Sequence, residues 1–191
     1  SRLGNALAQF GASDRALEAA NIGVSQKEAI LFASAAFYFG GYPASAYVTM
    51  RGIPGRFAHD AEQACHDLLA RPSEIASPLV RELKDGLVNG TPATLGGLLS
   101  QIKVATKVAL NVGPQSWIPL RLLQSLLEKF NTMNIRAVLP EGDADSWTPL
   151  VKSLVNRGSW DFFPSQIEAI TGGLLESDET FSLQMPTGAG K

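Results

Sequence analysis

Apolar residues recur at helical spacing along most of this chain, and glycine and proline divide the pattern into segments. Between residues 117 and 130 the apolar positions are Trp117, Leu120, Leu123, Leu127 and Phe130. Spacings of three and four place such side chains on one face of a helix. A period of two, typical of a half-buried strand, occurs over residues 180–185. The pattern therefore predicts a mainly α protein with a strand near residue 180.

Local start and stop signals give the bounds of the predicted helices. Ser25 and Glu28 have the spacing of a capping box, and the helix that they open stops at Gly40 and Gly41. Pro43 and Pro92 suit the first turn of a helix, where the missing N–H has no partner to lose. The predicted helices cover residues 3–20, 25–39, 43–52, 60–70, 73–88, 91–111, 117–130 and 147–156.

A short acidic stretch over residues 140–145 has the composition of a turn and predicts a domain boundary. We expect residues 1–140 to form a helical domain and residues 141–191 to begin a second domain. The chain starts with Ser1 and stops at Lys191 inside a motif. We therefore expect it to be a piece of a longer polypeptide.

Composition narrows the class of protein. The 191 residues are 45% hydrophobic and carry a formal net charge of -2, so no global basic character points to nucleic acid. The single cysteine, Cys65, excludes an internal disulfide framework and suits a reducing, cytoplasmic compartment. The longest apolar stretch, residues 29–39, is too short to span a bilayer, so we expect no membrane partner.

Charge is unevenly distributed along the chain. Residues 101–136 hold one acid, Glu128, against five basic residues, which are Lys103, Lys107, Arg121, Lys129 and Arg136. Residues 137–180 hold eight acids against two basic residues. The basic stretch could face a phosphate backbone, but such charges are more often the solvated faces of amphipathic helices.

The predicted strand leads directly into a glycine-rich turn with a terminal lysine. This candidate phosphate loop consists of Pro186, Thr187, Gly188, Ala189, Gly190 and Lys191. Glycines let the backbone curl and present successive N–H groups to phosphate oxygens, and a lysine at this position reaches the outer phosphates. The first position of the strict pattern holds Met185 rather than glycine.

A glutamine, Gln166, lies upstream of this loop and is a second candidate for contact with a nucleotide. Gln166 follows Pro164 in a predicted proline-started helix and precedes Lys191 by 25 residues. A glutamine amide can bond an adenine edge as donor and acceptor together. Together with the loop, Gln166 is a candidate adenine-reading residue.

Residues 159–191 resemble the start of a superfamily 2 helicase motor, most closely the superkiller-type and repair-helicase branch. Pro164-Ser165-Gln166 resembles the Q motif of that family, and residues 186–191 resemble its motif I, with Gly173-Leu174-Leu175 between them. The resemblance implies a RecA-like α/β motor domain that binds ATP and magnesium and acts on DNA or RNA. It further implies that Lys191 holds the β and γ phosphates. One of Trp160, Phe162 and Phe163 could then pack on the base, although core packing suits each of these aromatics equally well or better.

The resemblance also sets what residues 1–140 are expected to do. A helical domain attached to such a motor either docks a partner or buttresses the motor. Bacterial antiviral systems pair helicases of this kind with nuclease subunits, and the Hachiman helicase is one family that the arrangement resembles. These 191 residues lack the later motor motifs, so we do not expect them to hydrolyse ATP alone.

Other interpretations stay open. A helical interaction module with no working motor would explain the motif-free residues 1–140. A kinase or GTPase would explain the loop but not Gln166. His59, Cys65, His66 and Asp67 share one predicted helix, but we expect the adjacent His66 and Asp67 to point apart and no metal site to form. Cys65 is expected to pack as a small apolar residue.

Overall fold

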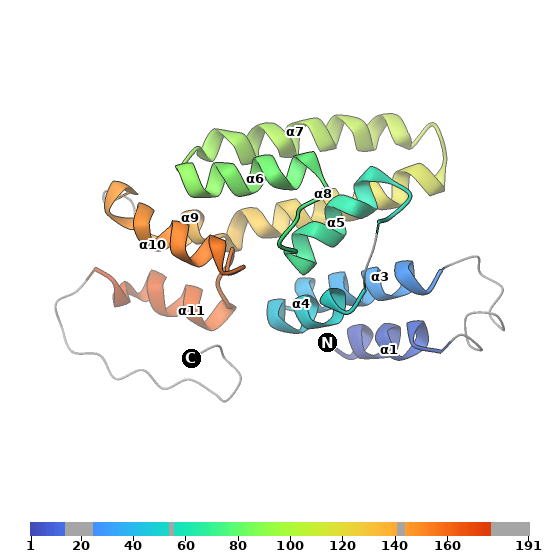
Figure 1. The fold of residues 1–191 in the computed structure, drawn as a ribbon, viewed down its shortest axis with the longest axis horizontal. Helices are drawn as coiled ribbons and strands as arrows, with labels where there is room; N and C mark the ends of the chain where they lie inside the picture. The colour runs from blue at the N-terminus through green and yellow to red at the C-terminus, as the bar shows by residue number, and fades with distance from the viewer. Residues whose placement is uncertain (14–24, 54–55, 141–143, 177–191) are drawn as a thin grey trace.

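Helices make up most of the part of the chain that the structure, a computed structural model, describes: residues 1–13, 25–53, 56–140 and 144–176 (Figure 1). The elements are α1 (Arg2–Gly11), α3 (Gln26–Phe39), α4 (Pro43–Arg51), α5 (Asp60–Ala70), α6 (Pro78–Asn89), α7 (Pro92–Ala109), α8 (Pro114–Met133), α9 (Ile135–Val138), α10 (Ala144–Asn156), α11 (Pro164–Ala169) and the π-helical turn η1 (Ile170–Leu174). Within these residues the only β-type pairing is an isolated antiparallel bridge between Asn134 and Asp161. The mainly α prediction is confirmed, and the predicted strand at residues 180–185 lies outside the described residues.

Several helix ends lie where local signals predict them. The Ser25 hydroxyl accepts the Glu28 N–H at 3.2 Å, and the Glu28 carboxylate accepts the Ser25 N–H at 2.6 Å, so the capping box is formed. Helix α4 begins at Pro43, and α5 covers residues 60–70 as predicted. These ends depend on neighbours within a few residues, which is why the sequence is enough to place them.

The helix predicted over residues 73–88 starts later, at Pro78, and the predicted start is wrong. Ser77 caps α6, and its N–H donates to the Asp67 carboxylate of α5 at 2.7 Å. This long-range bond holds Ser77 in an extended conformation, so the helix begins after it. At the other end of the chain, α10 begins at Ala144 rather than residue 147. Of the helix predicted over residues 3–20, the described part is α1, and residues 14–20 lie outside the description.

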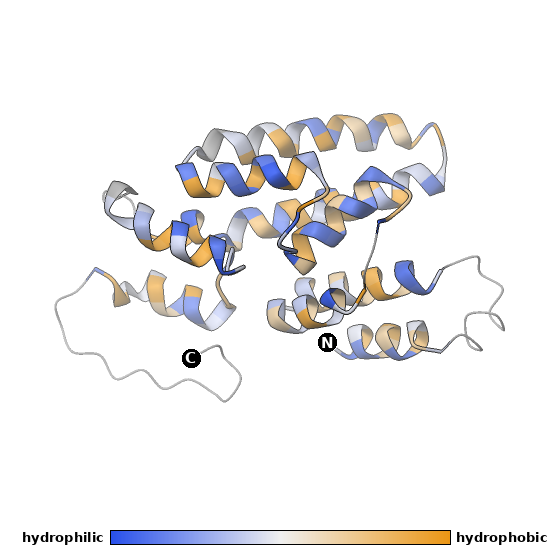
Figure 2. Cartoon of the chain, in the orientation of Figure 1, coloured by the Kyte–Doolittle hydropathy of each residue, from blue (hydrophilic) through white to orange (hydrophobic). Residues whose placement is uncertain are grey.

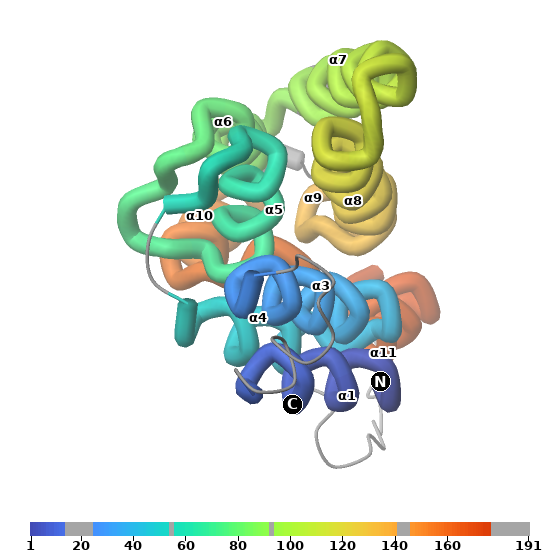
Figure 3. The backbone as a smooth tube through the Cα atoms, turned by 90° about the vertical axis from the view of Figure 1, so that its right-hand side faces the viewer, coloured from blue at the N-terminus to red at the C-terminus, as the bar shows by residue number. Residues whose placement is uncertain are grey.

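Helices α5 and α8 occupy the centre of the bundle (Figures 1 and 3). Helix α5 contacts α3, α4, α6 and α8, while α8 also contacts α3, α7 and α9. The largest side chains of this core that are almost fully buried include Leu68, Leu126, Leu127 and Phe130. Figure 2 shows apolar and polar residues alternating around the same helices, as expected of elements with one buried face.

Helix α1 packs closely on α3 because Gly4 has no side chain. A Cβ atom at Gly4 would lie 2.9 Å from ring atoms of Phe37. At the other end of the bundle α10 packs on α6, and Trp160 belongs to the common core. The predicted boundary after residue 140 adjoins residues 141–143, which lie outside the description, so the division into two domains stays a prediction. None of the described helices is long and apolar enough to cross a bilayer.

Candidate functional site

Only one half of the predicted nucleotide site lies among the residues that the structure describes. Residues 186–191, with Lys191, lie outside them, so their part in the site stays a prediction. Gln166 lies inside, in the first turn of α11. Its side-chain oxygen accepts the Phe163 N–H at 2.9 Å. This bond satisfies one free N–H at the helix start and fixes the amide there.

Two of the three aromatic residues expected near the base keep some exposed surface. Phe162 and Phe163 are half-buried, and Phe162 packs against the core. Trp160 is 2% exposed, and its indole N–H donates to the Val155 carbonyl at 2.9 Å. Trp160 is therefore a core residue in this structure, which agrees with the core-packing interpretation that the sequence left open for it.

The chain just before α11 is held to the bundle by a buried carboxylate. Asp161 accepts a hydrogen bond from the Tyr38 hydroxyl of α3 at 2.8 Å. It also forms an ion pair with Arg71 at 2.6 Å. Arg71 follows α5 and also donates to the Gly158 carbonyl at 2.8 Å. The Arg71 and Asp161 side chains are 9% and 2% exposed, so water barely screens the pair. We call Tyr38, Arg71 and Asp161 the anchor.

Backbone bonds reinforce the anchor. The Ile135 N–H donates to the Trp160 carbonyl at 3.1 Å, and the Phe162 N–H donates to the Met133 carbonyl at 2.9 Å. The Arg71 guanidinium also lies 5.6 Å from the centre of the Trp160 ring, within cation–π range. Segments from α3, α5 and the end of α8 thus fix the chain that leads into the Gln166 helix.

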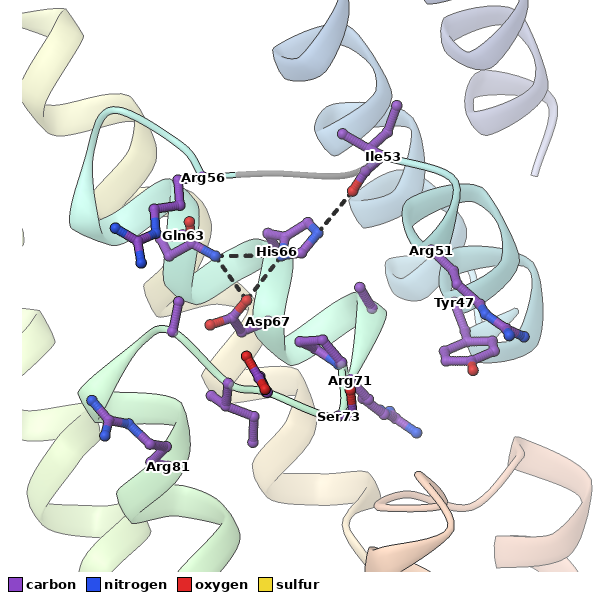
Figure 4. Close-up of a pocket in the computed structure, with 15 residues that line it drawn as sticks. Tyr47, Arg51, Ile53, Arg56, Gln63, His66, Asp67, Arg71, Ser73 and Arg81 are labelled. Carbon is purple, nitrogen blue, oxygen red and sulfur yellow. Dashed lines mark hydrogen bonds and ion pairs between the residues drawn. The ribbon is translucent and has the colours of Figure 1, made fainter.

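A second site was not predicted: a cavity of about 780 Å³ whose wall carries four arginines (Figure 4). It opens beside α4, α5 and the segment that leads into α6, and its wall includes Arg51, Arg56, Arg71 and Arg81. We call this cavity the arginine pocket. In Figure 4, Arg56 and Arg81 lie on one side of it and Arg51 on the other, with Arg71 between them.

A polar cluster from α5 forms one wall of the arginine pocket. The Asp67 carboxylate contacts His66 Nδ1 at 2.9 Å and accepts bonds from the Gln63 amide at 2.8 Å and the Ser77 N–H at 2.7 Å. The expectation that His66 and Asp67 point apart is wrong. Adjacent helical side chains leave the axis about 100° apart, and both of these reach round to meet.

The remaining nitrogen of His66 also faces an oxygen. His66 Nε2 lies 3.2 Å from the Ile53 carbonyl. Carboxylate and carbonyl oxygens both accept hydrogen bonds, so either ring nitrogen of His66 has an acceptor within reach when it carries a proton. Burial would raise the pKa of Asp67, but bonds from His66, Ser77 and Gln63 outweigh it and the pKa lies below its ordinary value. This cluster therefore keeps Asp67 ionised.

Two of the five basic residues counted in the stretch 101–136 have partners in the structure. Arg136 donates to the Leu87 carbonyl at 2.7 Å and to the Val88 carbonyl at 3.1 Å, which satisfies the last turn of α6. Lys103 pairs with Glu128 at 3.6 Å on exposed surface. Arg136 thus has a structural role, which corrects its inclusion among phosphate-facing candidates.

Cys65 is fully buried among apolar residues, as predicted, and burial raises the pKa of its thiol far above the ordinary range. Among the described residues, no three His, Cys, Asp or Glu side chains gather closely enough to hold a metal ion. Sequence comparisons add no relative: no protein-family model, curated protein or solved structure matches the chain.

Proposed function

We propose that this chain is the N-terminal portion of an ATP-dependent superfamily 2 helicase or translocase that acts on DNA or RNA. The observation that carries the proposal is one spacing in the sequence. Gln166 opens a helix 25 residues before the lysine of Pro-Thr-Gly-Ala-Gly-Lys. Other phosphate-loop classes, such as kinases and GTPases, have no equivalent of this glutamine.

In the proposed motor Lys191 holds the β and γ phosphates of ATP, and Gln166 bonds the adenine edge. Magnesium would be held by residues that follow Lys191. The position of Gln166 suits its role in one respect, because the bond from the Phe163 N–H keeps the amide at the first turn of α11. Phe162 and Phe163, both half-buried, are the aromatic candidates beside the base.

The helical part is proposed to buttress this motor. The anchor supports the idea, since Tyr38 and Arg71 hold Asp161 five residues before Gln166. A motor that changes shape with each ATP needs a fixed point against which its first elements are placed. The bundle supplies such a point directly before α11.

The test is nucleic-acid-stimulated ATP hydrolysis by the full-length polypeptide, wild type against Lys191→Ala. Lys152→Ala, which removes an exposed lysine of α10, is the matched control. We expect DNA or RNA to stimulate hydrolysis in the wild type and the control and not in Lys191→Ala. Hydrolysis that survives Lys191→Ala would refute the motor site.

A helical interaction module without a working motor is the second candidate function, favoured by exposed apolar residues. Val104, Val108, Leu110 and Val112, at the end of α7 and in the turn after it, are each more than 60% exposed. If no polymer stimulates hydrolysis, binding of a purified partner should be lost on Val108→Asp. Val48→Asp, at a valine 70% exposed on α4, is the control that should keep the partner.

A further inference from the structure

The arginines of the arginine pocket differ in whether their charge is balanced. Arg71 is paired with Asp161. Arg51, Arg56 and Arg81 are exposed, and no described carboxylate forms an ion pair with any of them. Arg51 lies 5.8 Å from the centre of the Tyr47 ring, so one of the three is oriented by a neighbour. Three arginines from separate segments therefore line one cavity, and no described carboxylate forms an ion pair with them.

The carboxylates of the pocket wall do not compensate these arginines. Among the described residues of the wall, only Asp67 and Glu74 carry a negative charge. Asp67 is 1% exposed, and its oxygens already accept from Gln63, His66 and Ser77. Glu74 alone remains on the exposed wall. The cavity is consequently electropositive, although the whole chain has a formal net charge of -2.

We infer that the arginine pocket binds the phosphate groups of a nucleotide or of a nucleic-acid strand. Guanidinium groups bind phosphate oxygens through two parallel N–H bonds, and they do so better than ammonium groups. The volume of about 780 Å³ lies in the range of small-molecule sites. In Figure 4, Arg51 lies on the opposite side of the pocket from Arg56 and Arg81, an arrangement that suits a ligand with several phosphate groups.

Gln166, the described residue of the proposed ATP site, is not among the residues that line the arginine pocket. The pocket also brings a phosphate ligand next to the anchor. Arg71 lines the pocket and holds Asp161 at the same time. The inference does not depend on ATP hydrolysis, and its test involves none.

The experiment measures binding by the 191-residue chain with three probes: a fluorescent single-stranded oligonucleotide, ATP and inorganic tripolyphosphate. The test variant is Arg51→Gln/Arg56→Gln/Arg81→Gln. The control, Arg2→Gln/Lys152→Gln/Arg157→Gln, removes three exposed basic residues outside the pocket and changes the net charge equally. The ATP measurement is repeated in Lys191→Ala, which separates the pocket from the predicted loop. Circular dichroism and thermal melting check that every variant is folded.

We expect the test variant to lose about tenfold or more in affinity for at least one probe while the control changes far less. For the oligonucleotide, the slope of log K against log salt should become shallower by about two, since three phosphate contacts are removed. Loss of oligonucleotide binding alone assigns the pocket to a strand, and loss of ATP or tripolyphosphate binding assigns it to a free phosphate ligand. Equal losses in both triple variants, or no binding of any probe, would overturn the inference.

Discussion

Arg71 and Asp161 lie 90 residues apart in the sequence, and their side chains meet in a 2.6 Å ion pair. Arg71 has a left-handed backbone conformation with φ of 47°, which is uncommon for a residue with a Cβ atom. The pair, the bond to Gly158 and the contact with the Trp160 ring hold this conformation in place. A strained residue thus joins the end of α5 to the chain before α11.

Replacing Arg71 by alanine should lower the free energy of unfolding by about 3–5 kcal/mol, because Asp161 would stay buried without its cation. Urea denaturation followed by circular dichroism measures the change. Arg121→Ala, at an exposed arginine of α8, should shift it by no more than about 0.5 kcal/mol. A loss for Arg71→Ala as small as that of the control would contradict the anchor.

Replacing Tyr38 by phenylalanine removes only the hydroxyl that donates to Asp161, and we expect a loss of about 1.5–3 kcal/mol. Burial and the negative Asp161 raise the pKa of Tyr38 well above its ordinary value. The phenolate absorbance is therefore measured against pH for the folded wild type and for Tyr38→Phe. The difference between the two titration curves should show no ionisation near pH 10. A difference signal at pH 10 would mean that the phenol is open to water.

Asp67 should make the folded chain sensitive to acid. Its pKa is lowered in the folded state, so its contribution to stability is complete above the ordinary aspartate value near 4. That contribution is lost as the pH falls through the lower, folded value. At pH 7 Asp67→Asn should cost about 2 kcal/mol or more, and the gap to the wild type should narrow below about pH 4. Asp85→Asn, on the exposed side of α6, is the control, and an equal profile for both variants would refute the assignment.

Cys65 should be unreactive while the chain is folded. Burial raises the pKa of its thiol and blocks access, and the thiolate is the reactive form. In a thiol-labelling assay the native chain should react only as fast as it opens, and the chain in denaturant should react at once. Ala44→Cys, which adds a thiol at an exposed position of α4, should label promptly and supplies the control. Rapid labelling of native wild type would contradict the buried position.

The sequence is sufficient for features set by neighbouring residues. Ser25 with Glu28, and Pro43 before α4, mark helix starts that the structure confirms, because caps and proline act within one turn. Cys65 in the core was likewise predictable from its residue type. The start of α6 was missed, although Ser77-Pro78 is itself a start signal in the sequence.

Features that depend on residues far apart in the chain could not be predicted from the sequence. Arg51, Arg56 and Arg81 belong to three separate segments, and only the packing of α4, α5 and α6 brings them round one cavity. Arg136 was assigned to a basic surface, but its partners are backbone carbonyls about 48 residues away. The contact between His66 and Asp67 depends on Ser77 and Ile53, which gather around them in the fold.

The bridge between Asn134 and Asp161 also sets how the chain responds to a pull. Its two hydrogen bonds, from Ile135 to Trp160 and from Phe162 to Met133, lie side by side across antiparallel segments. These two bonds and the Arg71–Asp161 pair all tie the chain before α11 to the bundle, so a pull on α11 acts on all three. Tension applied beyond residue 164 therefore reaches the bundle at its core, through α3, α5 and α8.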